Sequence, residues 1–171
     1  MEVVKANLFI VGAAKSGTTS LYDLLSVHDE INMSPIKEPH FFCKDINNNQ
    51  FSKNYENSIS LDEKDYFNKE VLESKHIAHI KDEGNYNKLF REGYTYNGDA
   101  STGYLFSEKA AQEIYNYNSN SKIIIILRDP VMRAISHWKM GVNIGAIDQS
   151  TDPVDSIISD YNLSGGWGEK H

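Results

Sequence analysis

The sequence predicts an α/β domain in which a mostly parallel central sheet is flanked by helices in three layers. Two apolar runs, Leu8–Val11 and the one within Lys122–Leu127, have the β-branched composition of buried strands. Each run is followed by apolar residues at helical spacing, and strands that alternate with helices favour parallel pairing. Ligands of such sheets bind beyond the carboxyl ends of the strands, so the segments that follow each strand are the first places to look for a site.

The first strand leads through a loop of small residues, 12–17, into a helix that begins near Thr18. Free backbone N–H groups and the helix dipole make such a helix start an anion site. Lys15 adds a full positive charge, and three side chains add hydroxyl donors: Ser16, Thr18 and Thr19. The combination favours a phosphate or another tetrahedral oxyanion. The alternative is an ordinary strand–turn–helix that binds no anion.

This loop nearly matches the phosphate-binding pattern G-x-x-x-x-G-K-[ST] but departs from it at one position. Gly12 and Gly17 have the required separation and Thr19 fits the last position, whereas Thr18 stands where the lysine belongs. Lys15 lies inside the loop and would reach an anion from the loop side. The expected domain is therefore P-loop-like without carrying the standard motif of a nucleotide triphosphatase.

A carboxylate at a fixed position is expected in the next segment. Ile31–Ser34 reads as a short extended stretch, and Pro35 and Pro39 follow it. The residue before a proline is pushed toward extended geometry, so Glu38 is expected to be extended and outside a helix. The aromatic run at 40–42 would pin this loop against the core. Glu38 is thus a candidate general base, although most glutamates are simply solvated.

The middle of the chain is less informative. Asn97–Asp99 is a turn signal, and Ser107 is a helix cap. The expected elements are a polar surface loop over 44–64, weakly patterned helices over 62–92, a short buried strand with a small-residue end over 99–106, and a helix over 108–118. The loop at 101–103 should then meet the loop at 12–17 at one edge of the sheet.

The run at 122–127 is the strongest strand signal and predicts a central strand buried on both faces. Asp129 and Pro130 are a good helix cap and first residue, so a helix is expected over 130–141, and the same start recurs for an amphipathic helix over 153–162. Arg128 at the strand end and Ser136 in the following helix form a candidate second phosphate site, because a guanidinium matches phosphate oxygens. A salt bridge to a neighbouring acid is the alternative for Arg128.

Composition excludes several classes of function. The 171 residues suit a single domain, and a formal net charge of −7 argues against nucleic-acid or anionic-membrane binding. Cys43 is the only cysteine, so no internal disulfide or cysteine zinc cluster is expected, in keeping with a cytoplasmic location. No apolar run approaches ~18–20 residues and no secretory signal is recognisable, which predicts no membrane span. The six histidines lack a metal-binding pattern and read as surface residues, including His76 and His79.

Four segments together resemble sulfotransferases that use 3′-phosphoadenosine 5′-phosphosulfate (PAPS). The stretch 12–22 looks like their 5′-phosphosulfate loop, and 37–42 resembles the segment with the catalytic glutamate in the heparan-sulfate type and its bacterial relatives. The stretch 99–105 is similar to their Glu-Ala-Ser-Pro-x-Tyr-Leu segment, and 126–137 looks like their 3′-phosphate-binding strand and helix. The order of the four segments also matches.

The resemblance implies a role for each candidate residue. The 5′-phosphosulfate would be held by Lys15, Ser16, Gly17, Thr18 and Thr19, and the 3′-phosphate by Arg128 and Ser136. Lys15 would also neutralise charge on the bridging oxygen as the sulfuryl group leaves. Glu38 would deprotonate an acceptor hydroxyl or amine for in-line attack on sulfur, with His40 as the second candidate. PAPS is then the co-substrate, and no metal is required.

Two departures from the family pattern limit what it implies. Heparan-type enzymes place a lysine near position 101, where this chain has Ser101 and Thr102, so polysaccharide specificity is not implied. The family domain continues into a C-terminal lid, so residues 1–171 are expected to be one domain that is incomplete at its C-terminus, or a naturally short one. The acceptor, a small molecule or a carbohydrate, and the oligomeric state stay open.

Two other functions compete with sulfotransfer. A P-loop kinase or nucleotide hydrolase would need Mg²⁺ and an acid to hold it, and Asp99 and Asp129 are the candidates for that acid. A truncated, non-catalytic module that binds PAP, the desulfated form of PAPS, is the third possibility.

Overall fold

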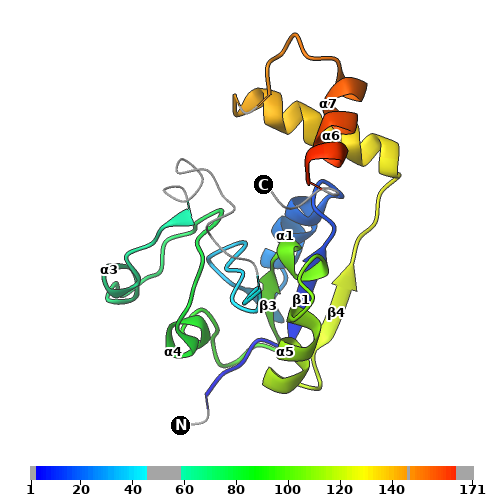
Figure 1. The fold of residues 1–171 in the computed structure, drawn as a ribbon. Coiled ribbons are helices and arrows are strands. Elements are labelled where there is room, and N and C mark those ends of the chain that lie inside the picture. Colours follow the sequence, from blue (N-terminus) through cyan, green and yellow to red (C-terminus); the bar gives the residue numbers. More distant parts are fainter. Residues whose placement is uncertain (1–2, 46–58, 146, 165–171) are drawn as a thin grey trace.

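The computed structural model describes residues 3–45, 59–145 and 147–164, and a four-stranded parallel sheet forms its centre (Figure 1). The strands lie in the order β2-β3-β1-β4, with every neighbouring pair parallel. Their bounds are Leu8–Gly12 for β1, Ile31–Met33 for β2, Tyr96–Ala100 for β3 and Lys122–Ile125 for β4. The α/β class with a parallel sheet, predicted from the sequence, is confirmed.

The helices connect these strands and extend beyond the last one. Their bounds are Thr18–Ser26 for α1, Glu63–Phe67 for α3, Glu83–Asn87 for α4, Thr102–Leu105 for the 3₁₀ helix η2, Ala110–Tyr117 for α5, Pro130–Asn143 for α6 and Pro153–Ser164 for α7. The side chain of Asp129 accepts from the backbone N–H of Met132 at 2.9 Å, and Asp152 accepts from Val154 at 2.8 Å. Both predicted caps at the starts of α6 and α7 are therefore confirmed.

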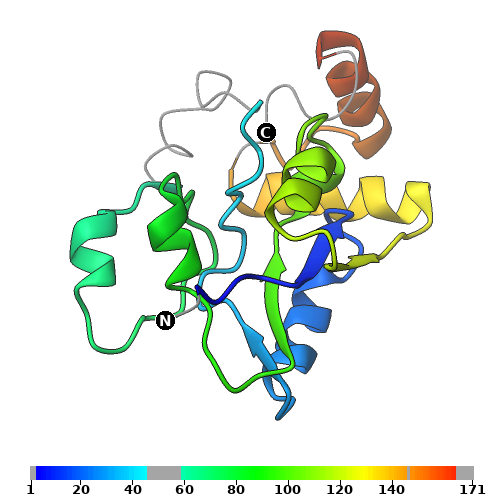
Figure 2. The same cartoon turned by 90° about the horizontal axis from the view of Figure 1, so that it is seen from below.

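Side chains of β1 alternate between two cores, one on each face of the sheet. Leu8 and Ile10 pack with Met33 and with the apolar side of α1. Phe9 and Val11 face the other way, into a cluster that includes Ala110 and Ile114 of α5 and aromatic rings from the connecting loops. The central strand is thus buried on both faces, and the helices form the outer layers. Both views place α3 and α4 on one side of the sheet, away from α6 and α7 (Figures 1 and 2).

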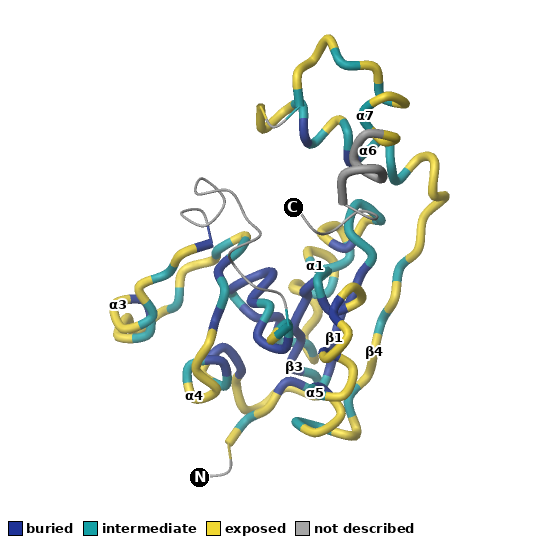
Figure 3. Tube along the Cα trace, viewed as in Figure 1, coloured by how far each residue is buried: buried dark blue, intermediate teal, exposed yellow. Residues whose placement is uncertain are grey.

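The prediction that the run at 122–127 forms a central, buried strand is wrong in its placement. This run forms β4, which lies at one edge of the described sheet, whereas the fully buried strand is β1 (Figure 3). Ile123 and Ile125 remain 49% and 52% exposed. An apolar run identifies a strand, but its place in the sheet depends on which other strands pair with it.

Two predictions in the middle of the chain are also corrected. Residues 97–99, which were predicted to form a turn, lie inside β3. The side-chain amide of Asn97 forms hydrogen bonds with the backbone of Arg91 and with the side chain of Asn32. Gly98 has no side chain, and this leaves room for Met33. The mostly helical region expected over 62–92 contains only α3 and α4, of five residues each. Most of the surface loop expected over 44–64 lies outside the described residues.

Candidate functional site

A cleft of about 480 Å³ lies where the segments that follow all four strands come together. It is lined by Ala14, Lys15, Gly17, Thr18, Thr19, Lys37, Glu38, His40, His76, Ile77, Thr102, Arg128, Ser136 and Met140. Every predicted site residue except Ser16 is on this wall. The cleft sits at the carboxyl edge of the parallel sheet, which is the expected place for a ligand of this class of fold.

The loop after β1 presents donors to the cleft. Gly17 caps α1 in the left-handed region at φ 99°, and no side chain caps the helix start. The first turn of α1 carries no acidic residue, so the positive end of its dipole is not offset locally. The Ser16 hydroxyl oxygen is buried and has no hydrogen-bond partner within the described residues. A buried polar atom of this kind calls for a partner that the chain itself does not supply.

The segment after β4 closes the cleft from the other side. The Arg128 guanidinium donates from Nη1 to the carbonyl oxygen of Lys15 at 3.2 Å. Lys15 in turn lies with its Nζ 3.6 Å from the Sδ of Met140 on α6, and Ser136 is on the same helix. The two predicted phosphate sites therefore open into one cleft.

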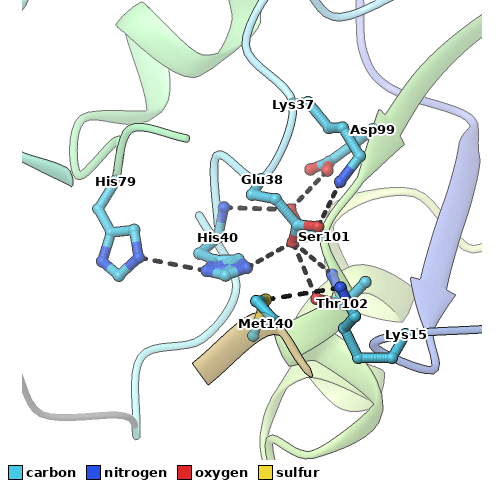
Figure 4. A network of polar contacts seen from close by, with 9 residues as sticks. All are labelled: Lys15, Lys37, Glu38, His40, His79, Asp99, Ser101, Thr102 and Met140. Carbon is cyan, nitrogen blue, oxygen red and sulfur yellow. Dashed lines mark hydrogen bonds and ion pairs between the residues drawn. The ribbon is translucent and has the colours of Figure 1, made fainter. Parts of the chain in front are cut away.

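Glu38 is held by a set of hydrogen-bond donors (Figure 4). Its Oε1 accepts from Lys37 Nζ at 2.6 Å, and its Oε2 contacts His40 Nε2 at 2.8 Å. The backbone N–H and the hydroxyl of Thr102 also donate to Oε2, at 2.7 and 3.1 Å. These donors fix the position of the carboxyl group. Glu38 reaches the cleft wall although only 7% of the residue is exposed.

The prediction that Glu38 has an extended backbone is wrong. Glu38 has φ 63° and His40 has φ 51°, so both lie in the left-handed region on either side of Pro39. Tertiary contacts hold this geometry, because the N–H of Glu38 donates to the carbonyl oxygen of Ala100 at 2.9 Å and that of His40 donates to Ser101 Oγ at 3.1 Å. A left-handed backbone costs energy in a residue other than glycine, and such strained residues cluster at active sites and ligand clamps.

A buried carboxylate, that of Asp99, supports the loop that carries Glu38 and His40. Asp99 is fully buried and accepts from the hydroxyl groups of Tyr86, Tyr104 and Ser101, each at 2.7 Å. Burial raises the pKa of Asp99 to about 6. Since Ser101 also accepts from the backbone of His40, Asp99 positions the loop through it. Asp99 is therefore occupied in the core, and Asp129 caps α6, so neither of the two candidate magnesium ligands faces the cleft as a free carboxylate.

The interpretation as surface residues holds for His76 but not for His79. His76 is exposed but lines the cleft, and the half-buried His79 has its Nε2 3.2 Å from His40 Nδ1. Burial lowers the pKa of both His40 and His79 to about 4. No local pattern near position 79 signals the contact, because the segment is brought there by a hydrogen bond from Ile80 to Pro39.

No group of three or more histidine, cysteine, aspartate or glutamate side chains in ranges 3–45, 59–145 and 147–164 is arranged to hold a metal ion. Within those ranges, no helix has both the length and the apolar character needed to cross a membrane.

Fold and site together define a P-loop-like α/β protein with a cationic cleft at the carboxyl edge of a parallel sheet. Comparison with known proteins shows which family within this class the chain belongs to. The model of the sulfotransferase family matches residues 7–164, and the chain belongs to that family.

A crystal structure of a sulfotransferase from Alicyclobacillus acidocaldarius has the same fold, with a TM-score of 0.68 and 33% sequence identity; the match covers 94% of this chain and 58% of that one. Human carbohydrate sulfotransferase 15 is 26% identical over 148 residues, and mouse heparan sulfate glucosamine 3-O-sulfotransferase 5 is 27% identical over 129 residues. These matches cover 77% and 75% of this chain but only 26% and 29% of the relatives. The chain thus corresponds to little more than a quarter of those proteins.

Proposed function

We propose that this chain is a sulfotransferase that moves a sulfuryl group from PAPS to a hydroxyl or amine of a small-molecule or carbohydrate acceptor. Membership of the sulfotransferase family supports the reaction class. The names of the carbohydrate and heparan sulfate relatives support a sugar hydroxyl as one acceptor class.

One observation carries the proposal: Lys15 and Arg128, from segments 113 residues apart, lie in one cleft and are joined by a hydrogen bond. A nucleotide with phosphate groups at both ends needs two cationic sites within a single pocket. Lys15 and the start of α1 would hold the 5′-phosphosulfate, together with the remaining loop residues Ser16, Gly17, Thr18 and Thr19. Arg128 and Ser136 would hold the 3′-phosphate.

The residues present fit such a donor. The Ser16 hydroxyl lacks a protein partner in the described structure, and the open N–H groups of the first turn of α1 face no acidic residue of that turn. Lys15 contacts only a methionine sulfur through its ammonium group among the hydrogen bonds of the described residues. These donors can exchange weak contacts for strong, charge-assisted ones when an oxyanion binds.

When PAPS is bound, it supplies the sulfuryl group and the leaving phosphate. The chain's own residues then have two tasks. Glu38 takes the proton from the hydroxyl or amine of the acceptor substrate, and Lys15 compensates the charge that develops at the leaving oxygen. Oε2 of Glu38 already receives three donors, whereas Oε1 accepts only from Lys37 among the described residues, so Oε1 is the atom that takes the proton.

The alternative of a kinase or nucleotide hydrolase is less well supported. The two carboxylates considered for Mg²⁺ are used elsewhere: Asp99 by three buried hydroxyl groups and Asp129 by the start of α6. A non-catalytic module that only binds PAP uses the same cleft and differs from an enzyme in transfer alone.

Thermal unfolding with PAP in the absence of magnesium tests the site. A ligand that binds only the folded state at 100 times its Kd stabilises it by about 2.7 kcal/mol, so the melting temperature should rise. Lys15→Ala and Arg128→Ala should each abolish the rise, whereas Arg91→Ala, an exposed cation away from the cleft, should keep it. A rise with Mg²⁺ and ATP but not with PAP would favour the kinase. Transfer of labelled sulfate to a panel of sugars and phenols then separates an enzyme from a binding module.

A further inference from the structure

Two imidazole rings extend outward from Glu38 in a row (Figure 4). His40 Nε2 lies 2.8 Å from Glu38 Oε2, and His40 Nδ1 lies 3.2 Å from His79 Nε2. The His40 ring therefore uses both of its nitrogen atoms in hydrogen bonds. Nothing in the family resemblance points to His79, which stands outside all four matching segments.

The positions of the hydrogen atoms in this row follow from its two ends. A carboxylate can only accept, so His40 Nε2 is the donor to Glu38. A neutral imidazole has a single N–H group, so His40 Nδ1 is an acceptor and His79 Nε2 must be the donor to it. The row runs in one direction, from His79 through His40 to Glu38.

The surroundings hold both rings in this arrangement. The N–H of His79 donates to the carbonyl oxygen of Ile59 at 3.2 Å, and the next N–H, that of Ile80, donates to the carbonyl oxygen of Pro39. The centroids of the two imidazole rings are 4.9 Å apart. On the opposite side, a Cβ at Gly103 would lie 3.4 Å from His40 Nε2, so the ring is packed closely there.

We propose that His79 is a positioning residue for Glu38: its Nε2–H group occupies the one lone pair through which His40 could take up a proton. His40 then stays a neutral donor to Glu38. Without His79, the Nδ1 of His40 is open to protonation, and an imidazolium beside Glu38 would pair with the carboxylate and weaken it as a base. The catalytic meaning of this role rests on the proposed function, but the hydrogen-bond arrangement itself does not.

The same geometry removes His40 as a competing base. Its free electron pair is on Nδ1, which faces His79, and its other nitrogen carries the hydrogen that Glu38 accepts. Among the described residues, the titratable groups that act on the two rings include Lys37, Glu38, Tyr104 and Lys81. The positive charge of Lys37 acts in the same sense as His79, since it also disfavours a proton on His40.

NMR of the histidine rings tests this arrangement directly, in the absence of PAPS and of any acceptor substrate. In ¹⁵N-labelled protein at pH 7, two-bond ¹H–¹⁵N spectra should show both His40 and His79 as Nε2–H tautomers. On titration, His40 should stay neutral down to about pH 5, since its pKa is about 4. A wild-type His40 in the Nδ1–H tautomer would overturn the proposal.

Three variants complete the test. In His79→Ala, the midpoint of His40 protonation should rise by about one pH unit or more. His79→Gln keeps an amide N–H donor that cannot titrate and should hold the midpoint near its wild-type value. The control His28→Gln, a change of an exposed histidine that does not line the cleft, should do the same. An unchanged His40 midpoint in His79→Ala would overturn the proposal. If His79→Ala does not fold, His79→Leu takes its place, because leucine fills the site without an N–H donor, and an unchanged His40 midpoint in that variant overturns the proposal.

Activity provides a separate readout. The acidic limb of the pH profile of kcat should move to higher pH in His79→Ala and return in His79→Gln, with the KM for PAPS unchanged in both. A merely structural loss would lower kcat at every pH and leave the limb in place. A chain that transfers no sulfate contradicts the proposed function alone, because the NMR results stand without it.

Discussion

The guanidinium of Arg128 donates a hydrogen bond to the carbonyl oxygen of Lys15 at 3.2 Å. This bond ties the segment after β4 to the loop after β1. It places two cationic side chains on neighbouring parts of one cleft wall, although each was recognised from a different local pattern. The relationship makes the two sites interdependent, since a change at Arg128 alters a charge and also the support of the Lys15 loop.

The first prediction concerns the shape of the Arg128 side chain. Arg128→Lys keeps the charge but loses the planar fork, so the affinity for PAP should fall about tenfold. Arg128→Ala removes the charge-assisted bonds as well and should cost on the order of 100-fold. Isothermal titration calorimetry measures both, with Arg91→Ala as the control. Equal affinities of the lysine variant and the wild type for PAP would exclude a bidentate contact between Arg128 and the phosphate.

The second prediction concerns Glu38. Glu38→Gln keeps the size of the side chain but removes its basicity, so the transfer rate should fall by about 10²–10⁴-fold. The Kd for PAP should stay within about twofold, because Glu38 is not among the proposed phosphate ligands. Single-turnover transfer and calorimetry separate the two effects, and Glu92→Gln, on the exposed surface, is the matched control. A parallel loss of PAP binding would show that Glu38 acts through the fold of the cleft.

The third prediction is a loss of stability in mild acid. His40 and His79 have folded-state pKa values of about 4, below the ordinary 6.5 of the unfolded chain. Between those values the unfolded state binds more protons, so the free energy of unfolding falls as the pH drops from 6.5 toward 4. The slope from the buried His40 is at most about 1.4 kcal/mol per pH unit. Asp99 acts in the opposite direction between its unfolded 3.8 and folded pKa of about 6, because there the folded state binds more protons.

Urea unfolding at pH 7, 6 and 5 checks this balance. His79→Gln removes one of the two histidines that lower the stability in mild acid, so it should reduce the pH dependence of the free energy of unfolding. His28→Gln should leave that dependence unchanged. A wild-type protein that is equally stable at pH 5 and pH 7, together with an unaltered slope in His79→Gln, would contradict the prediction.

The fourth prediction concerns Gly12, at the end of β1. Gly12 has φ 150°, and a Cβ there would lie 2.9 Å from the Cβ of Leu105 on η2. Gly93 also has a positive φ, of 88°, but a Cβ there would meet nothing within 4 Å. Gly12→Ala should therefore destabilise the chain by about 1–3 kcal/mol more than Gly93→Ala, since it adds an overpacked contact to the backbone strain. Chemical denaturation compares the two, and equal losses would show that the backbone alone decides.

Local patterns predicted those parts of the site that local physics determines. The loop at 12–17, the helix start at Thr18 and the cap at Asp129 depend on residues within a few positions of one another, and each is found where it was expected. Because strands in a parallel sheet end at one edge, the meeting of Lys15 with Arg128 also followed from the order of the elements.

What failed depends on distant contacts. The place of β4 at the sheet edge is set by which strands pair, and Glu38 is held left-handed by a bond to Ala100 that no neighbouring residue signals. The role of His79 arises from a segment 39 residues away from His40. Such contacts are not encoded in the spacing of apolar residues, and they include the strongest constraints on the general-base candidate.

The cleft is assembled from segments that run from Ala14 to Met140 in the chain. A nascent polypeptide that has emerged only through β4 would possess the glycine loop and the glutamate but not the wall supplied by α6. Under the proposed function, a nucleotide would then bind only after α6 has packed against the loop after β1. In refolding experiments, PAP binding should accordingly appear later than the helical circular dichroism signal, and it would report when α6 has packed against the loop after β1.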